Sequence, residues 1–286
     1  MTAAPVRTVT QAAVADLAEV PATSRWVRSG GIRLHVLDYG GAGAPLVMIP
    51  GITSPAITMD FVARELTDIV HPFVVDVRGR GFSDSGPSYA LGDYADDTVA
   101  VIEGLDLTRP VLLGHSMGAR IAAVTAARGT PLRASVLVDP PLSGPQRGPY
   151  PTTVEAFLGQ IAQAHRGTSA DEVARSWPRW PRREQELRAR WLGTCDVDAI
   201  VATHRGFETE DFFDTWPDVP APTVLIHGAD SPVVPADSIA ELTRRNPRAS
   251  LLAVPGAGHM VFWDEPGLAR TALRQVLERL VGTDEL

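Results

Sequence analysis

A serine between two glycines is the feature of this sequence best suited to chemistry. Ser116 lies in Gly-His-Ser-Met-Gly, residues 114–118, after the apolar run 111–113 and before the helix-forming run 119–127. A G-x-S-x-G motif between a strand and a helix is typical of a nucleophilic serine held on a sharp, strained turn. The N-terminus of the following helix directs a partial positive charge toward the reacting centre. This context favours Ser116 as a catalytic nucleophile over the alternative of a structural turn serine.

A serine is a weak nucleophile until a base takes its proton, so a histidine must lie beside Ser116 in space. His259 is the expected base because it follows the last predicted strand, in a glycine-rich loop before the C-terminal helix. It therefore comes last in the chain order Ser…Asp…His. The other histidines are interpreted as non-catalytic, with His115 structural and His165 and His204 on the surface of an inserted segment.

The attack of a serine on a carbonyl creates a negative oxygen, which two backbone N–H groups must stabilise. Met117, the residue after the nucleophile, is expected to supply one, and the loop after the strand at 46–49 to supply the other. In that loop, residues 49–54, Ile52 is the expected donor, and Gly51 lets the backbone pass close to a substrate. An ordinary strand–helix turn would explain the glycine but not a loop that faces the nucleophile.

These residues need elements that bring them together, and the hydrophobic pattern predicts which ones. Continuous apolar runs are typical of parallel strands buried on both faces. Strands are predicted at 32–37, 46–49, 73–77, 111–113, 135–138, 223–226 and 250–254. Helices are expected between them, near 57–68, 92–104, 117–128, 236–246 and 265–281. The alternation predicts the α/β class, with a mostly parallel, doubly wound sheet.

The alternation stops between about 142 and 216, where the sequence is rich in tryptophan and arginine and is predicted to be helical. We expect this insertion to cap the carboxyl ends of the strands, where an open α/β sheet binds its ligand. The predicted organisation is a loosely attached N-terminal arm over 1–25, a core made of 26–141 and 217–286, and a helical cap over 142–216.

Length, charge and cysteine content exclude several classes of protein. The 286 residues suffice for one large α/β domain with an insertion. A net charge of −8 gives no basic surface for nucleic acid, and the single cysteine, Cys195, provides neither an internal disulfide nor a C-x-x-C metal site. Residues 1–7 lack a secretory signal and no run of about 18 apolar residues occurs, so we expect a cytoplasmic protein without a membrane span. The oligomeric state is not predicted.

Together these residues resemble the α/β-hydrolase superfamily over residues 26–282. The loop 76–83, Asp-Val-Arg-Gly-Arg-Gly-Phe-Ser, also looks like the loop after that superfamily's fourth strand. Within the superfamily the chain is similar to the N-formylmaleamate deformylases of bacterial nicotinate degradation, in segments 50–58, 115–120, 138–145, 191–195 and 257–260. The (acetamidomethylene)succinate hydrolases of vitamin B6 breakdown share fewer of these segments. The arm, Asp230 and the cap stretch 177–186 depart from the deformylase pattern.

The resemblance implies an α/β-hydrolase fold with an inserted helical cap, and a hydrolase that acts on a linear amide C–N bond without a metal or organic cofactor. The implied substrate is a small unsaturated acid with an N-formyl group, split into maleamate and formate. A carboxylesterase or lactonase, or an amidohydrolase of the (acetamidomethylene)succinate type, are alternatives with the same nucleophile. A cofactor-free oxygenase or perhydrolase, or a ligand sensor without catalysis, are further alternatives.

The acid of the triad has two candidates, Asp139 and Asp230. Many relatives carry the acid in a Gly-x-x-Asp pattern after the seventh strand, but in 228–235 that position, counted back from Pro235, is held by Ser231. Asp230 lies one residue early, and a shift of one residue in a tight loop redirects a side chain. Asp139 follows the sixth strand, where a carboxylate could accept the Nδ1 proton of the catalytic histidine. The chain order, the offset and the deformylase resemblance favour Asp139.

An anionic substrate requires cationic side chains, preferably guanidinium groups that bind a carboxylate in a bidentate manner. Arg120 follows the serine motif, and two of the cap arginines, Arg147 and Arg188, fall in family-like stretches. We expect at least one of the cap arginines or Arg120 to bind a substrate carboxylate, with Arg147 and Arg188 favoured, while most cap arginines are interpreted as solvated charges on helix faces. The expected partner is thus a small anionic amide or ester.

Overall fold

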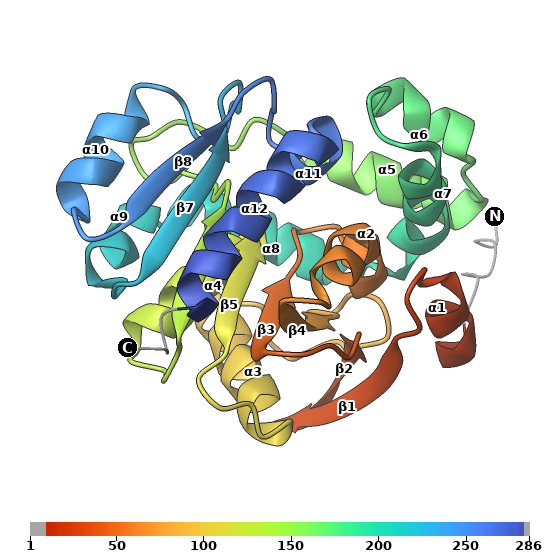
Figure 1. Ribbon diagram of the computed structural model, residues 1–286. Helices are drawn as coiled ribbons and strands as arrows, with labels where there is room; N and C mark the ends of the chain where they lie inside the picture. Colours follow the sequence, from red (N-terminus) through yellow and green to blue (C-terminus); the bar gives the residue numbers. More distant parts are fainter. Residues whose placement is uncertain (1–9, 283–286) are drawn as a thin grey trace.

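One sheet of eight strands forms the centre of the computed structural model, which describes residues 10–282 (Figure 1). The strands are β1 (Thr23–Ser29), β2 (Ile32–Asp38), β3 (Ala44–Ile49), β4 (Val70–Val75), β5 (Val111–His115), β6 (Ala134–Val138), β7 (Thr223–Gly228) and β8 (Ser250–Val254). They lie in the order β1-β2-β4-β3-β5-β6-β7-β8. β2 pairs antiparallel with β1 and β4, and the other neighbouring pairs are parallel. The predicted α/β class and mostly parallel sheet are confirmed.

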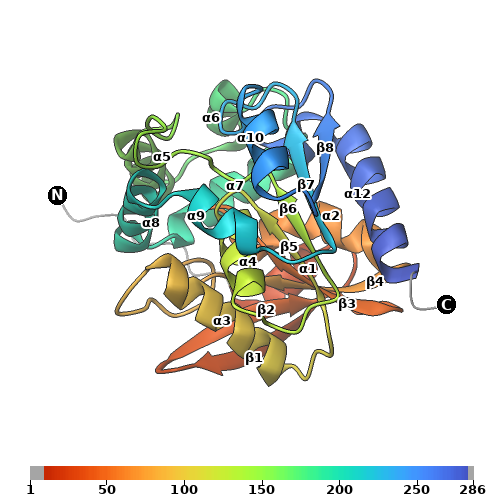
Figure 2. The ribbon, with the colours of Figure 1, turned by 90° about the vertical axis from the view of Figure 1, so that its left-hand side faces the viewer.

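Helices cover both faces of this sheet (Figure 2). The core helices are α2 (Asp60–Ala63), α3 (Leu91–Gly104), α4 (Met117–Ala127), α10 (Ser238–Arg245), α11 (Val261–Asp264) and α12 (Pro266–Val281). Successive side chains of a strand point to opposite faces. In β3, Val47 and Ile49 therefore join the apolar cluster that includes α3 and α4, whereas Leu46 and Met48 join the cluster that includes α2 and α12. Packing on both faces fixes the carboxyl ends of the strands, from which the site is built.

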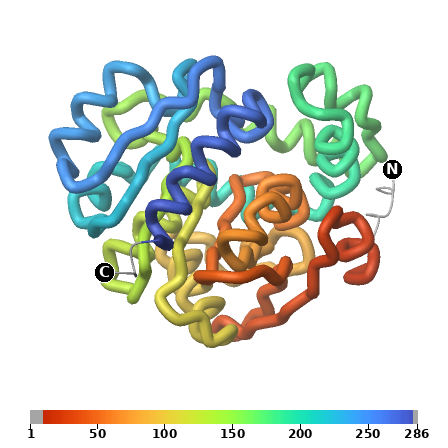
Figure 3. Tube along the Cα trace, in the orientation of Figure 1, coloured from red at the N-terminus to blue at the C-terminus, as the bar shows by residue number. Residues whose placement is uncertain are grey.

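Between β6 and β7 the chain forms a group of helices, in the segment for which the sequence predicts a cap. They are α5 (Val154–Arg166), α6 (Ala170–Ser176), α7 (Arg182–Trp191), α8 (Val197–Thr209) and α9 (Phe212–Thr215). α6 and α7 lie at the same side of the molecule as the N-terminal helix (Figure 3). These helices contact the loops after β3 and β4: Arg188 Nη1 is 3.3 Å from Thr53 Oγ1, and Arg80 Nη2 is 3.0 Å from Thr203 Oγ1.

The N-terminal segment is attached more firmly than the predicted loose arm. Helix α1 (Gln11–Leu17) buries Val14, which is 1% exposed. Glu19, which follows the helix, forms an ion pair 3.2 Å long with Arg183 of α7. The segment therefore contacts the inserted helices as well as the core. Residues 1–9 of the predicted arm lie outside the described residues.

Two elements differ from the sequence prediction. The hydrophobic pattern does not predict β1, because this edge strand exposes Arg25, Trp26 and Arg28 and so lacks a continuous apolar run. Since β1 begins at Thr23, the predicted boundary at residue 25 falls inside a strand. The helix expected near 57–68 is divided into 3-10 and α turns over residues 56–66.

Candidate active site

Ser116 lies on the sharp turn between β5 and α4. Its backbone angles, φ 56° and ψ −118°, belong to a region that residues other than glycine rarely adopt. The turn forms because strand and helix touch: a Cβ atom on Gly114 would lie 2.0 Å from the carbonyl oxygen of Gly118. A Cβ atom on Gly118 would lie 2.0 Å from the carbonyl oxygen of Ile49. Glycine is therefore required at both positions, and the turn presents the serine hydroxyl beyond the end of the sheet.

The loop after β8 brings His259 to this serine. Its Nε2 atom is 2.9 Å from Ser116 Oγ, and its Nδ1 atom is 2.7 Å from Oδ2 of Asp139. The Asp139 side chain is fully buried, whereas that of His259 is 17% exposed. In this arrangement the histidine can take the serine proton while the carboxylate stabilises the imidazolium.

The structure brings Asp139, and not Asp230, to the histidine. Asp139 follows β6 directly and accepts two further hydrogen bonds, from the backbone N–H of Gly228 at 2.9 Å and from the Ser231 hydroxyl at 2.6 Å. Asp230 is exposed, and its backbone N–H binds a carbonyl of the neighbouring loop. The residue at the usual acid position, Ser231, thus supports the acid on the neighbouring strand.

The loop after β3 passes directly over the nucleophile. A Cβ atom on Gly51 would lie 3.4 Å from Ser116 Cβ and 3.8 Å from Ser116 Oγ, which is ordinary van der Waals contact, so the backbone of this loop adjoins the serine. Ile52, next in this loop, is buried, and so is Met117, which opens α4. The N–H groups of a first helical turn have no partner within the helix. The two expected oxyanion donors thus come from segments that both adjoin the serine.

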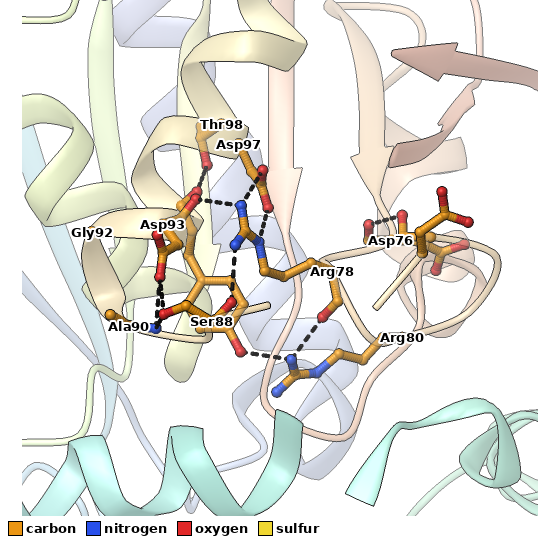
Figure 4. Close-up of polar contacts among 12 residues, drawn as sticks. Asp76, Arg78, Arg80, Ser88, Ala90, Gly92, Asp93, Asp97 and Thr98 are labelled. Atoms are coloured by element: carbon orange, nitrogen blue, oxygen red, sulfur yellow. Dashed lines mark hydrogen bonds and ion pairs between the residues drawn. The ribbon is translucent and has the colours of Figure 1, made fainter. Parts of the chain in front are cut away.

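The loop after β4 carries two arginines, Arg78 and Arg80, that form polar contacts with neighbouring elements, and Figure 4 shows those on the side of α3. Arg78 binds Asp97 of α3 through two hydrogen bonds, 2.6 and 2.7 Å long. Arg80, which is fully buried, donates from Nε to the carbonyl oxygen of Ile52 at 3.0 Å and from Nη2 to Thr203 of α8 at 3.0 Å. The sequence of this loop resembles that of a known family. No local sequence signal, however, predicts that Arg80 links the expected oxyanion donor Ile52 to the inserted helices.

Sequence reasoning missed Tyr150, which lies against the triad. Its hydroxyl oxygen is 3.2 Å from Nε2 of His259, and its ring meets the imidazole edge-on, with 6.2 Å between centroids and 79° between planes. The side chain is 5% exposed, although it belongs to the loop between β6 and α5. Only its position between Pro149 and Pro151 distinguishes it in the sequence.

The other three histidines considered in the sequence, His115, His204 and His165, have structural surroundings. His115 is buried beside the triad, with Nε2 3.1 Å from the carbonyl oxygen of His259, and burial lowers its pKa to about 4, so its ring stays neutral. The prediction that His204 lies on the surface is wrong: it is 5% exposed, and its Nε2 is 2.8 Å from the carbonyl oxygen of Thr152. The ring of His165 is half-buried and bonded to a backbone carbonyl. Helix packing, which the local sequence does not reveal, buries His204 and partly covers His165.

Arg147 and Arg120, two of the three predicted carboxylate-binding arginines, are bound by oxygens of neighbouring residues. The guanidinium of Arg147 lies 2.7 Å from Asp211 and 2.9 and 3.1 Å from the two carboxylate oxygens of Glu241, which favours a structural role. Arg120 is 2% exposed and donates from Nη2 to the backbone oxygen of Glu210 at 2.6 Å. Its Nε and Nη1 atoms have no hydrogen-bond partner among the described residues, so substrate binding by Arg120 stays a prediction.

Arg188 in α7 is buried without an acidic partner. Its guanidinium lies 2.7 Å from Gln160 Oε1 and 3.3 Å from Thr53 Oγ1, and 5.8 Å from the ring centres of both Trp177 and Trp180. Within residues 10–282, no carboxylate lies within ion-pair distance of it. Burial lowers the pKa of Arg188 to about 10, which leaves it protonated at neutral pH. A buried charge without a counter-ion is costly and marks a place where an anion would be stabilised.

The part of the chain that the structure describes contains neither a cluster of metal ligands nor a membrane-spanning helix. No three His, Cys, Asp or Glu side chains there are placed to hold a metal ion. None of the helices between residues 10 and 282 combines the length and apolar character that a membrane crossing needs.

The strand order, the strained serine turn and the Ser116–His259–Asp139 geometry define a protein of the α/β-hydrolase class. The chain belongs to the alpha/beta hydrolase family, whose model matches residues 46–271, and is a hydrolase. It is 43% identical over 242 residues to the N-formylmaleamate deformylase of Pseudomonas putida, across 84% of this chain and 90% of that protein. The 2-(acetamidomethylene)succinate hydrolase of Mesorhizobium japonicum is 30% identical over 283 residues, covering 92% of this chain and 98% of that protein.

A solved structure supports the same relationship. The crystal structure of the N-formylmaleamic acid deformylase from Pseudomonas putida S16 matches with a TM-score of 0.83 and 40% sequence identity. The match covers 88% of this chain and 99% of that structure. The resemblance to the deformylases that the sequence motifs indicate is confirmed.

Proposed function

We propose that this chain is a cofactor-independent serine amidohydrolase that splits N-formylmaleamate into maleamate and formate. One observation carries the proposal: the hydrogen-bonded triad Asp139–His259–Ser116 lies close to the buried guanidinium of Arg188, which contacts the loop after β3 and has no carboxylate partner within residues 10–282. The triad supplies the nucleophile and the base that break an acyl bond, and the guanidinium favours a substrate with a carboxylate. The relative that is 43% identical is named for this reaction.

The reaction begins with the attack of Ser116 on the formyl carbon. His259 Nε2, 2.9 Å from Oγ, takes the hydroxyl proton as the new C–O bond forms, and Asp139 stabilises the resulting imidazolium at Nδ1. The electrons of the carbonyl double bond move to the oxygen. The N–H groups of Ile52 and Met117 then bind this oxyanion.

Collapse of the tetrahedral intermediate breaks the C–N bond. The proton on Nε2 of His259 moves to the departing nitrogen, so maleamate leaves as a neutral amide and the formyl ester remains on Ser116. A water molecule, deprotonated by the same Nε2, attacks the ester and forms a second oxyanion. Breaking the C–O bond to the serine then releases formate and restores the hydroxyl.

Arg188 is proposed to bind the carboxylate of the substrate. Its contact with Thr53, 3.3 Å away, places the guanidinium beside the loop that carries the expected oxyanion donor Ile52. A carboxylate that reaches Arg188 would replace the missing counter-ion with charge-assisted hydrogen bonds. The same substrate would then present its formyl end to the serine.

Measuring formate release from N-formylmaleamate tests the proposal. We expect the wild-type protein to release formate and maleamate in equal amounts, and Ser116→Ala to be at least about 10³-fold slower. 4-Nitrophenyl acetate and 2-(acetamidomethylene)succinate serve as comparison substrates, with dissolved oxygen monitored in parallel. Rapid ester turnover without formate release would identify a carboxylesterase instead, and acetate release from the second compound an acetamido hydrolase.

A further inference from the structure

The Tyr150 hydroxyl does not belong to the catalytic triad, yet it lies where the leaving group must be protonated. Its oxygen is 3.2 Å from His259 Nε2, the atom that also lies 2.9 Å from Ser116 Oγ. Within the part of the chain that the structure describes, these are the two side-chain hydroxyls bonded to Nε2. A nitrogen that receives its proton from Nε2 must come within hydrogen-bond distance of that atom, and therefore close to the Tyr150 oxygen.

The surroundings of Tyr150 fix both its position and its protonation state. Its ring centre is 4.8 Å from that of Phe207 and 6.2 Å from that of Phe157, in an apolar setting. Burial raises the pKa of the hydroxyl above its usual range, so the group stays a neutral phenol. A neutral phenol donates one hydrogen bond and accepts others. When the hydroxyl donates its one hydrogen, the lone pairs of its oxygen are left to accept.

Amides and esters differ at the atom that leaves. In an amide the leaving atom is a nitrogen that already carries a hydrogen. As the C–N bond breaks, its electron pair stays on the nitrogen and takes the Nε2 proton. The N–H bond then points in another direction and requires an acceptor, since an unpaired donor in a closed site is costly. The leaving oxygen of an ester carries no hydrogen and needs no such acceptor.

We propose that the Tyr150 oxygen accepts a hydrogen bond from the N–H of the leaving nitrogen, and that Tyr150 is the catalytic residue that favours amides over esters. The inference rests on the proposed acyl transfer at Ser116, but not on which acid carries the formyl group. The hydrogen bond forms only as the nitrogen comes within reach of the Nε2 proton in the transition state. It therefore raises kcat and leaves KM nearly unchanged.

The test compares Tyr150→Phe with the wild type on 4-nitroformanilide and 4-nitrophenyl formate. These substrates share acyl and aryl groups and differ only in N–H or O at the leaving atom, and phenylalanine keeps the ring packing. We expect kcat for the anilide to fall by about 10- to 100-fold, as for the loss of one hydrogen bond in the transition state. The kcat for the ester is expected to change by less than about threefold.

N-Methyl-4-nitroformanilide removes the donor from the substrate instead of the acceptor from the protein. We expect the wild type to hydrolyse it more slowly than the unmethylated anilide, a measurement that requires no variant. Tyr150→Phe should then have no further effect on it, since the effects of two groups that act through one hydrogen bond are not additive. Tyr89→Phe is the matched control: it removes a hydroxyl that binds Asp196 at 3.0 Å, and the amide-to-ester ratio should not change.

Equal losses on anilide and ester would overturn the proposal, because a residue that only orients His259 affects both. An unchanged anilide rate would also overturn it. So would a wild-type protein that hydrolyses the ester but neither the anilide nor N-formylmaleamate, since it would have no amide preference to explain. A wild-type protein that cleaves the anilide but not N-formylmaleamate would contradict the proposed substrate alone, and the Tyr150 comparison would still decide the inference.

Discussion

Three groups converge on the buried carboxylate of Asp139, and they explain how an acid after β6 can serve the histidine. His259 Nδ1 lies 2.7 Å from Oδ2, the Ser231 hydroxyl donates to the same oxygen at 2.6 Å, and the Gly228 N–H donates to Oδ1 at 2.9 Å. The end of β7 and the loop after it thus contribute hydrogen-bond donors where many relatives place the carboxylate itself. The position of Asp139 depends on both loops.

Replacing Asp139 tests this assignment of the acid. Asp139→Asn is expected to lower kcat by about 10³- to 10⁴-fold, because an amide at this position no longer stabilises the imidazolium and favours the wrong tautomer of His259. Formate release at saturating substrate measures the loss. Asp230→Asn, an exposed change one residue before Ser231, is the matched control and should stay within about twofold of the wild type. A larger loss in the control than in Asp139→Asn would reverse the assignment.

Among the secondary-structure elements, those that are buried on both faces, or marked by a short local motif, can be predicted from the sequence. Strands β3, β5, β6 and β7 are largely buried on both faces and leave apolar runs in the sequence, whereas the edge strand β1 does not. Ser116 and His259 are predictable because each lies in a short glycine-rich pattern between elements. Tyr150 and Arg80 are not, because their contacts depend on the path of a long loop and on the approach of α8. No periodicity in the local sequence indicates the contacts of Tyr150 or those of Arg80.

Helix α7 allows the proposed carboxylate contact to be tested. Arg188→Ala is expected to raise KM for N-formylmaleamate by about 10- to 100-fold, because the substrate loses its charge-assisted hydrogen bonds. The KM for the neutral ester 4-nitrophenyl formate should change little. For N-formylmaleamate, the KM of Arg188→Lys should lie between those of the wild type and Arg188→Ala, because lysine keeps the charge but cannot form two parallel hydrogen bonds with the carboxylate. Arg147→Ala, whose guanidinium is held by Asp211 and Glu241, is the control and should leave both KM values unchanged. Equal increases for acid and ester would remove Arg188 from the binding site.

For the molecule as a whole, the N-terminal segment, the core and the inserted helices meet at one group of charges. Arg183 of α7 donates to Asp60 of the core at 2.6 Å, to the carbonyl oxygen of Leu17 at 2.8 Å and to Glu184 at 2.9 Å. Because its partners come from separate segments, this junction fixes the start of α7. Arg188 lies farther along the same helix, so the junction also helps to hold the proposed carboxylate contact in place.

Glu184 makes the stability of this junction depend on pH. Burial raises the pKa of its carboxyl from 4.5 to about 7; Asp60 adds to the rise, while Arg183 and Arg64 oppose it. Below pH 4.5 the carboxyl is neutral in the folded and unfolded chains, and the burial carries no ionisation cost. Between pH 4.5 and 7 only the unfolded chain ionises, so the free energy of unfolding falls as pH rises. Above pH 7 a constant cost of at most about 3 kcal/mol remains.

Glu184→Gln removes this ionisation and keeps a carbonyl oxygen for Arg183. We expect its free energy of unfolding, measured in urea, to match the wild type near pH 4.5 and to exceed it by about 2–3 kcal/mol at pH 8. Glu186→Gln is the control on the same helix: its side chain is 57% exposed, and the difference from the wild type should not vary with pH. An equal gain at both pH values would mean that packing, not ionisation, is responsible. A loss at pH 8 would mean that the ionised carboxylate binds Arg183 more strongly than burial penalises it, and that the junction requires this charge.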